Sequence, residues 1–173
     1  MERARVIAAA PAGRMSASAL RQYGALVRSA QMAGGLEYLL AQTVRYVSER
    51  KQFGRPIASF QAIQHNLALL ADHTAAAGIA AMNAFRAADR GDAAFEIAAA
   101  KVRTGEAAGL GAGIAHQCHG AIGFTYEHSL HFVTRRLWSW RAEFGAESHW
   151  AAEVGRHVAG RGADQLWPDL TAR

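Results

Sequence analysis

The chain has 173 residues, of which 51% are hydrophobic and 19% are charged, and its formal net charge is +5. This composition excludes a disordered protein, and the length is enough for one domain with a real core. The 19 basic and 14 acidic residues are spread along the chain without a long Lys/Arg block. We therefore interpret the charge as a solvated face and expect no nucleic-acid partner.

Residues 1–15 are predicted to be an N-terminal tail or a short strand. Their apolar run ends at Pro11, so it is too short for a typical targeting segment and far too short to span a bilayer. The single cysteine, Cys118, cannot form a disulfide within the chain and suits a reducing compartment such as the cytoplasm. We expect it to act as a small buried hydrophobe.

Four long helices are predicted, over about residues 16–48, 59–90, 92–118 and 129–143. In the first two, apolar residues recur every three or four positions, the spacing of one helix face. Ser59 and Ser129 are the expected N-caps of the second and fourth helices, and Gly91 is a natural stop for the second. Glycines within the first and third helices are typical of close approach by a neighbouring helix or a ligand.

Short turns between such long helices predict an all-α fold, an up-down antiparallel four-helix bundle. A short extra helix is expected over about residues 146–159. The predicted domain boundaries are a bundle at 16–160 and a C-terminal tail at 161–173, which we expect to be frayed unless Leu166 and Trp167 dock.

The segment 49–65, between the first two helices, is the most informative part of the sequence. Arg50, Lys51 and Arg55 surround Phe53 just before a helix start, and Gly54 permits a positive φ. The free N–H groups of a helix N-terminus suit a phosphate-bearing ligand. On chemistry alone a plain turn with solvated charges is the more common explanation, because basic residues are frequent beside a helix start.

Two motifs in this chain resemble the acyl-CoA dehydrogenase family, in the C-terminal domain of its members. The first is R-x-Q-F-G-x-P-I-x-x-F-Q-x-I-Q-H, from Arg50 to His65. The second, from Gln117 to Thr125, is similar to the family's Q-x-x-G-G-x-G-[FY]-[ST] turn. The resemblance covers roughly residues 15–155 and implies a helical bundle that closes one side of a flavin and acyl-CoA site.

The same resemblance implies the cofactor FAD and the α,β-desaturation of an acyl-CoA thioester. Family members typically carry an N-terminal helical domain and a middle β-domain ahead of this bundle, and neither is present here. The chain is therefore expected to be a fragment or a short subunit, which forms a homo-oligomer or pairs with a larger acyl-CoA dehydrogenase-like chain. Arg5 to Ile7 would be a remnant of the last strand of the β-domain.

The resemblance also carries family cofactor contacts to individual residues. Arg50 matches an arginine that reaches the flavin pyrophosphate of a neighbouring subunit, which a guanidinium can bind as a fork. The other matching positions are Gln52, Phe53, Phe60, Gln61, Gln117, Gly120 and Ala121. Ala121 replaces the family's usual second glycine, and its methyl group crowds the expected cofactor position.

The catalytic base is the clearest departure from the family. Removal of the α-proton requires a carboxylate beside the α-carbon, and the family places a glutamate at one of two positions. Alignment puts Phe144 at one and Gly24 at the other, and Ala25 stands where a neighbouring arginine is expected. Glu143, one residue away, is a weak candidate for the base and otherwise a solvated carboxylate at a helix end.

The remaining signals point to contacts rather than chemistry. No Glu-x-x-His pair occurs, so no metal site is predicted despite eight histidines. Trp138 and Trp140 are two apart, so one should be core and the other should face outward as a contact surface. The alternative function is a cofactor-free helical assembly module on the same fold.

Overall fold

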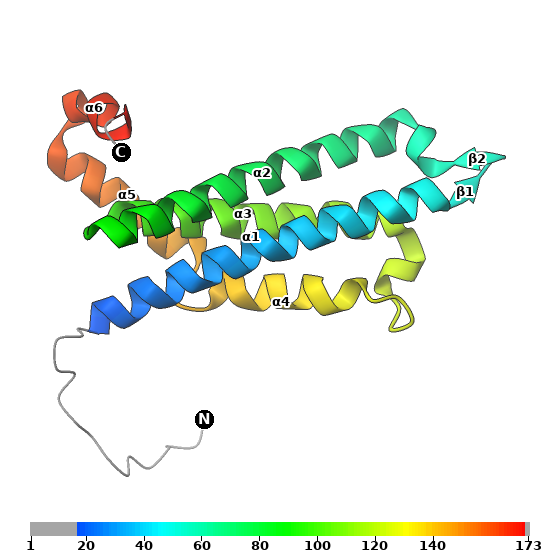
Figure 1. Cartoon of the computed structure of the whole chain (residues 1–173), viewed down its shortest axis with the longest axis horizontal. Helices are drawn as coiled ribbons and strands as arrows, with labels where there is room; N and C mark the ends of the chain where they lie inside the picture. The colour runs from blue at the N-terminus through cyan, green and yellow to red at the C-terminus, as the bar shows by residue number, and fades with distance from the viewer. Residues whose placement is uncertain (1–16, 172–173) are drawn as a thin grey trace, which may run out of the picture.

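Helix-forming alanine and leucine dominate the long periodic stretches, and these stretches fold into four antiparallel helices (Figure 1). The computed structural model describes residues 17–171. The long helices are α1 (Ala17–Glu49), α2 (Gln61–Arg90), α3 (Ala94–His119) and α4 (Leu130–Ala142). The predicted all-α, up-down four-helix bundle is confirmed.

Shorter elements complete the chain. They are the strands β1 (Lys51–Gln52) and β2 (Arg55–Pro56), the helices α5 (Glu147–Arg161) and α6 (Leu166–Thr171), and the 3₁₀ turns η1 (Ile57–Ser59), η2 (Gly120–Phe124) and η3 (Ala163–Gln165). Helix α5 packs on α3. In Figure 1, α6 stands beside the C-terminal end of α2, at the opposite end of the bundle from the strands.

Helix α3 forms the centre of the bundle because small residues let its neighbours approach closely. It packs against α1, α2, α4 and α5. Ala107, Ala108 and Ala115 are fully buried and pack with Leu36 and Leu39 of α1 in one core cluster. Most of the bundle is therefore built around a backbone that carries little side-chain volume.

The segment between α1 and α2 is a two-residue β-hairpin rather than a plain loop. Lys51 pairs with Pro56 and Gln52 with Arg55, in antiparallel register. At the tip, Phe53 has a φ of 52° and Gly54 a φ of 79°. Two successive positive φ angles are the geometry of the turns that close tight hairpins, and Gly54 adopts it without a Cβ clash.

Some predicted element ends differ from the structure. Phe60, not Ser59, is the N-cap of α2, because the Ser59 hydroxyl donates to the Pro56 carbonyl inside η1 (2.8 Å). Ser129 is the N-cap of α4 as expected, but its hydroxyl accepts a hydrogen bond from Gln42 instead of capping the helix.

The C-terminal tail is helical rather than frayed. Helix α5 runs to Arg161, and residues 163–171 form η3 and α6. Trp167 is nevertheless 73% exposed, so it is not docked on the bundle. The tail or strand expected over residues 1–15 lies outside the described residues.

Because helices pack closely around α3, replacing Gly111 and replacing Gly113 with alanine should affect the stability of the protein differently. A Cβ on Gly111 would lie 2.7 Å from Leu36 Cδ2 and 3.1 Å from Leu70 Cδ1, whereas one on Gly113 would meet nothing within 4 Å. Gly113→Ala should stabilise the protein by about 1 kcal/mol through helix propensity. Gly111→Ala should be less stable than that variant by about 1–3 kcal/mol, because the core is overpacked.

Chemical denaturation of the two variants measures this difference directly. Equal free energies of unfolding for both would show that the leucines around Gly111 relax without cost, and that close packing does not constrain this part of α3.

Candidate functional site

The two sequence motifs meet in one surface hollow at the hairpin end of the bundle. Its volume is about 610 Å³, and its walls come from the end of α1, the hairpin, η1, the start of α2 and the end of α3. The lining residues include seven of the eight predicted cofactor contacts: Arg50, Gln52, Phe53, Phe60, Gln117, Gly120 and Ala121. The eighth, Gln61, is exposed at the first position of α2 and does not line the hollow.

One wall of the hollow is cationic and aromatic. Arg50 is exposed and forms no ion pair with any residue from 17 to 171. The Arg55 guanidinium carbon lies 4.3 Å from the centre of the Phe60 ring, and the edge of Phe53 meets that ring at 6.1 Å between centroids. This wall offers a free guanidinium and apolar ring surface to a ligand.

Phe53 is the most exposed aromatic side chain of this wall. It is 90% exposed, and its positive φ is unfavourable for a bulky residue. Burial does not stabilise this conformation within the chain. An exposed ring at the tip of a strained hairpin is therefore a candidate contact with another molecule.

The floor of the hollow is built by the end of α3. His119 is only 4% exposed and stacks on Tyr46 of α1 at 4.3 Å between ring centres. The Tyr46 hydroxyl donates to the His119 carbonyl (3.3 Å), and Nδ1 of His119 bonds to the Ala115 carbonyl (2.7 Å). Cys118 is buried beside this pair, as expected for a small hydrophobe, and burial raises the pKa of its thiol.

Burial also controls the charge state of this floor. Desolvation lowers the pKa of His119, the Ala115 carbonyl acts in the opposite direction, and the neighbouring His128 and His116 lower it further. Desolvation likewise lowers the pKa of His116. Both imidazoles are therefore held in the neutral form.

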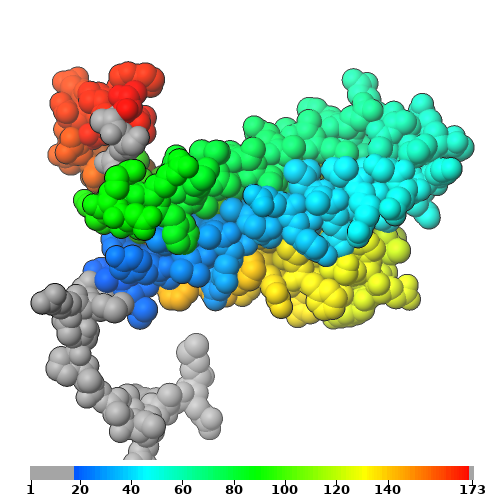
Figure 2. All heavy atoms as spheres, in the orientation of Figure 1, coloured from blue at the N-terminus to red at the C-terminus, as the bar shows by residue number. Residues whose placement is uncertain are grey.

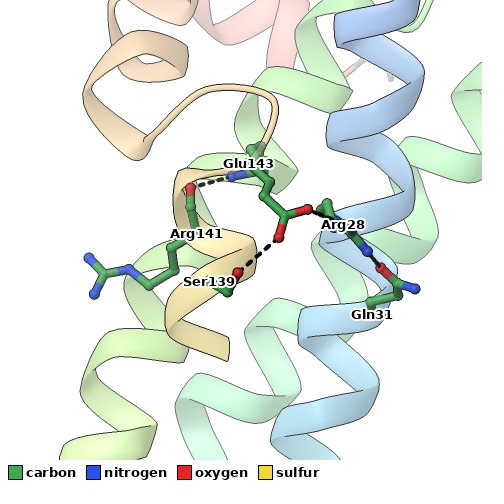
Figure 3. Close-up of polar contacts among 6 residues, drawn as sticks. Arg28, Gln31, Ser139, Arg141 and Glu143 are labelled. Carbon is green, nitrogen blue, oxygen red and sulfur yellow. Dashed lines mark hydrogen bonds and ion pairs between the residues drawn. The ribbon is translucent and has the colours of Figure 1, made fainter. Parts of the chain in front are cut away.

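The weak base candidate, Glu143, lies at the elbow between α4 and α5, far along α4 from the hollow. Figure 3 shows its carboxylate pointing at Arg28 of α1 and at Ser139. Arg28 Nε donates to Oε2 at 2.7 Å, and the Ser139 hydroxyl donates to Oε1 at 2.9 Å. The carboxylate thus links the end of α4 to α1.

Gly24 and Phe144, the two positions that the sequence resemblance matches to the family's base, meet at the same elbow. A Cβ on Gly24 would lie 2.3 Å from Cδ1 of the Phe144 ring, so the ring lies directly on the α1 backbone. Phe144 has a φ of 57°, and its carbonyl accepts a hydrogen bond from Trp150 Nε1 (3.0 Å). Neither Gly24 nor Phe144 has a group that can take a proton.

Sequence reasoning missed Lys101, which holds this elbow from α3. Its side chain is fully buried, and Nζ donates to the carbonyls of Arg141 (2.7 Å) and Gly145 (2.9 Å). Desolvation lowers the pKa of its ammonium to about 8, although Glu147 raises it. A lone lysine in an Ala/Gly-rich helix is the only signal that could have revealed it.

The remaining candidates are contact residues. Trp138 is 46% exposed while Trp140 packs against the core, so the predicted division of the two tryptophans is confirmed. No three or more His, Cys, Asp or Glu side chains are placed to hold a metal ion in the part of the chain that the structure describes. Over the same residues, no helix is long and apolar enough to cross a membrane.

The acyl-CoA dehydrogenase C-terminal domain, as a sequence family, matches residues 12–158 of the chain. The chain belongs to the acyl-CoA dehydrogenase family. Acyl-CoA dehydrogenase IpdE2 of Mycobacterium tuberculosis is 38% identical over 112 residues, which are 65% of this chain and 34% of that protein. Acyl-CoA dehydrogenase FadE34 of the same organism is 34% identical over 143 residues, 81% of this chain and 20% of that protein. The chain therefore spans only a fifth to a third of these relatives.

Solved structures of the family share the fold. The ChsE4–ChsE5 complex of M. tuberculosis aligns with a TM-score of 0.78 at 27% identity, over 81% of this chain and 38% of that chain. The glutaryl-coenzyme A dehydrogenase–glutaryl-CoA complex aligns with a TM-score of 0.77 at 27% identity, over 81% of this chain and 36% of that chain. This bundle is the C-terminal domain of an acyl-CoA dehydrogenase family protein.

The buried imidazoles predict that acid destabilises the floor of the hollow. An unfolded histidine takes up a proton near pH 6.5, whereas His119 and His116 resist protonation in the folded state. The unfolded state then binds more protons, so stability is full above pH 6.5 and falls as the pH drops towards the folded pKa. His119→Phe, which can keep the stacking on Tyr46, should reduce this loss.

Urea denaturation at about pH 7.5 and about pH 5 measures the effect. His65→Phe, at an exposed position of α2, is the matched control and should leave the pH dependence as in the unaltered protein. The same loss of stability in the His119→Phe variant would contradict the assignment.

Proposed function

We propose that this chain contributes one wall of an FAD site in the α,β-desaturation of an acyl-CoA thioester, and that a partner chain holds the rest of the cofactor. The observation that carries the proposal is the hollow itself. Motifs about 65 residues apart in sequence converge on it, and they bring together the residues that match the family's cofactor contacts.

The residues of the hollow fit a dinucleotide. The Arg50 guanidinium can bind a diphosphate through two parallel hydrogen bonds, and its lack of an ion pair within the described part of the chain leaves it available. Phe53 and Phe60 offer apolar ring surface beside it. The amide of Gln117 offers hydrogen bonds on the opposite wall.

The shape of the site supports the proposal that the cofactor is shared. The hollow is open, and Phe53 projects from it into solvent. A flavin ring needs an enclosing surface on both faces, which residues 17–171 do not supply here. We therefore assign the other surface to a second copy or to a larger acyl-CoA dehydrogenase-like chain, which also holds the acyl-CoA.

The catalytic base, unlike part of the cofactor site, is expected to come from the partner chain. Bound FAD supplies the acceptor for the hydride that leaves the β-carbon. A carboxylate must take the α-proton, and the elbow presents Phe144 and Gly24 at the matching positions while Glu143 pairs with Arg28. We therefore assign this chain to cofactor binding and assembly, and the base to its partner.

Replacing Arg50 tests the cofactor site. In the assembled complex, Arg50→Ala should weaken FAD binding by roughly 1.5–3 kcal/mol, the range for hydrogen bonds to charged groups. Arg50→Lys should recover only part of this, because an ammonium cannot form the fork. Flavin absorbance retained after gel filtration gives the measurement.

Arg136→Ala is the matched control, because Arg136 is exposed on α4 and does not line the hollow. Unchanged flavin retention in the Arg50→Ala variant would show that Arg50 is a solvated turn residue. A colourless complex with every variant would favour the cofactor-free assembly module.

The chain alone should not dehydrogenate acyl-CoA. Loss of a positioned general base commonly costs about 10²–10⁴ in rate, before the missing half of the cofactor site is counted. The measurement is anaerobic bleaching of FAD by a panel of acyl-CoAs mixed with the purified chain. Bleaching that Glu143→Gln abolishes would instead make Glu143 the base and overturn the assignment.

A further inference from the structure

A second hollow lies between α2 and α3, at the end of the bundle away from the hairpin. Its volume is about 700 Å³, and alanines and Ile79 form much of its apolar surface. Ile79 is more than half exposed and lies among these alanines, so the apolar surface of the groove is open to solvent. We call this hollow the α2–α3 groove.

The chain also carries a segment whose apolar side chains are exposed to solvent. It consists of residues 163–171 (η3 and α6), and we call it the C-terminal arm. Leu166, Trp167 and Leu170 are 42%, 73% and 49% exposed. In Figure 2 the arm projects from the bundle beside the end of α2. A helix of six residues gains little stability by itself in water, so the arm is an element that needs a surface to pack on.

The arm meets its own groove only at the edge. Leu170 lines the groove, whereas Leu166 and Trp167 do not. Helix α6 follows α5 through a single glycine and η3, and the Arg161 guanidinium binds both carboxylate oxygens of Asp169, with Nη2 to Oδ1 at 2.8 Å. This pairing ties α6 to α5, so the chain's own arm leaves its largest apolar side chain in solvent.

One end of the groove offers two basic side chains that suit an acidic arm. Arg86 and Arg90 line this end, and neither forms an ion pair among residues 17–171. The groove also carries two acidic residues, Asp72, about 21 Å from Arg86 along α2 at the rise of a helix, and Glu96 in the first turn of α3. On the arm, Asp164 is exposed directly before the apolar side chains.

We propose that the C-terminal arm of a second copy of this chain docks in the α2–α3 groove, with Trp167 as its anchor and Asp164 facing Arg86 and Arg90. Each copy carries both the arm and the groove, so a twofold axis covers both pairs of surfaces at once. The arm lies beyond residue 158, where the family match ends, so the inference is independent of the flavin site.

Sedimentation equilibrium of the full chain tests the proposal. The unaltered chain should be a dimer. Trp167→Ala should raise the dimer dissociation constant at least about tenfold, as expected for a buried aromatic anchor. Because Trp167 is mostly exposed within one copy, the substitution should leave the helical circular dichroism unchanged.

A charge exchange makes the test specific for the arm and the groove. Arg90→Glu and Asp164→Arg should each weaken the dimer, and their combination should restore most of the affinity. Arg135→Glu, at an exposed position of α4 outside the groove, is the matched control and should have no effect.

Three results would overturn the proposal. They are a chain that stays monomeric at high concentration, a dimer that tolerates both Trp167→Ala and the single charge reversals, and a monomer whose arm is held only by a larger acyl-CoA dehydrogenase-like chain. None of these results depends on whether the Arg50→Ala variant retains FAD. The docking proposal can therefore fail without the flavin proposal failing, and the reverse is also true.

Discussion

The close approach of helices to α3 is the constraint on which the rest of the structure depends. Its buried face is made mainly of alanine and glycine, so α1, α2 and α4 pack almost onto its backbone. This packing fixes both ends of the molecule. At one end it brings the last turn of α3 against Tyr46 and Ile57, and at the other it places Lys101 under the elbow between α4 and α5. A bulkier α3 would separate the walls of the hollow and withdraw the support of the elbow together.

The sequence was sufficient for the elements that depend on local signals. Apolar periodicity and glycine stops defined the long helices, and short connections implied their antiparallel order. The convergence of Arg50 and Gln117 on one hollow could not be derived from periodicity, since it depends on the relative rotation of α1 and α3. It came from the resemblance, and seven of the eight residues matched in that way line the one hollow. Gln61 falls outside because η1 delays the start of α2 and turns that side chain away.

The parts that the sequence did not reveal depend on which partner each polar side chain finds in the folded chain. Ser59 has a good capping side chain, but the preceding 3₁₀ turn engages its hydroxyl first. Glu143 looks like a solvated carboxylate at a helix end until α1 brings Arg28 beside it. A buried lysine contradicts the usual preference of its type for the surface, and only the unpaired carbonyls of a sharp elbow account for it. For Glu143 and Lys101 the partner lies elsewhere in the fold, whereas for Ser59 it is the Pro56 carbonyl only three residues earlier.

Two phenylalanines, Phe53 and Phe144, are the non-glycine residues with a positive φ among those the structure describes. They occupy the two places where the family resemblance assigns chemistry, and their surroundings are opposite. Phe53 is almost fully exposed on a hairpin that no residue from 17 to 171 covers. Phe144 is held against Gly24 by hydrogen bonds from Trp150 and Lys101 to the elbow. A strained residue persists only where other interactions compensate for it. At Phe144 this compensation is present within the chain. At Phe53 the strand pairing of the hairpin holds the turn while the ring stays exposed, so the side chain is available for contact with another molecule.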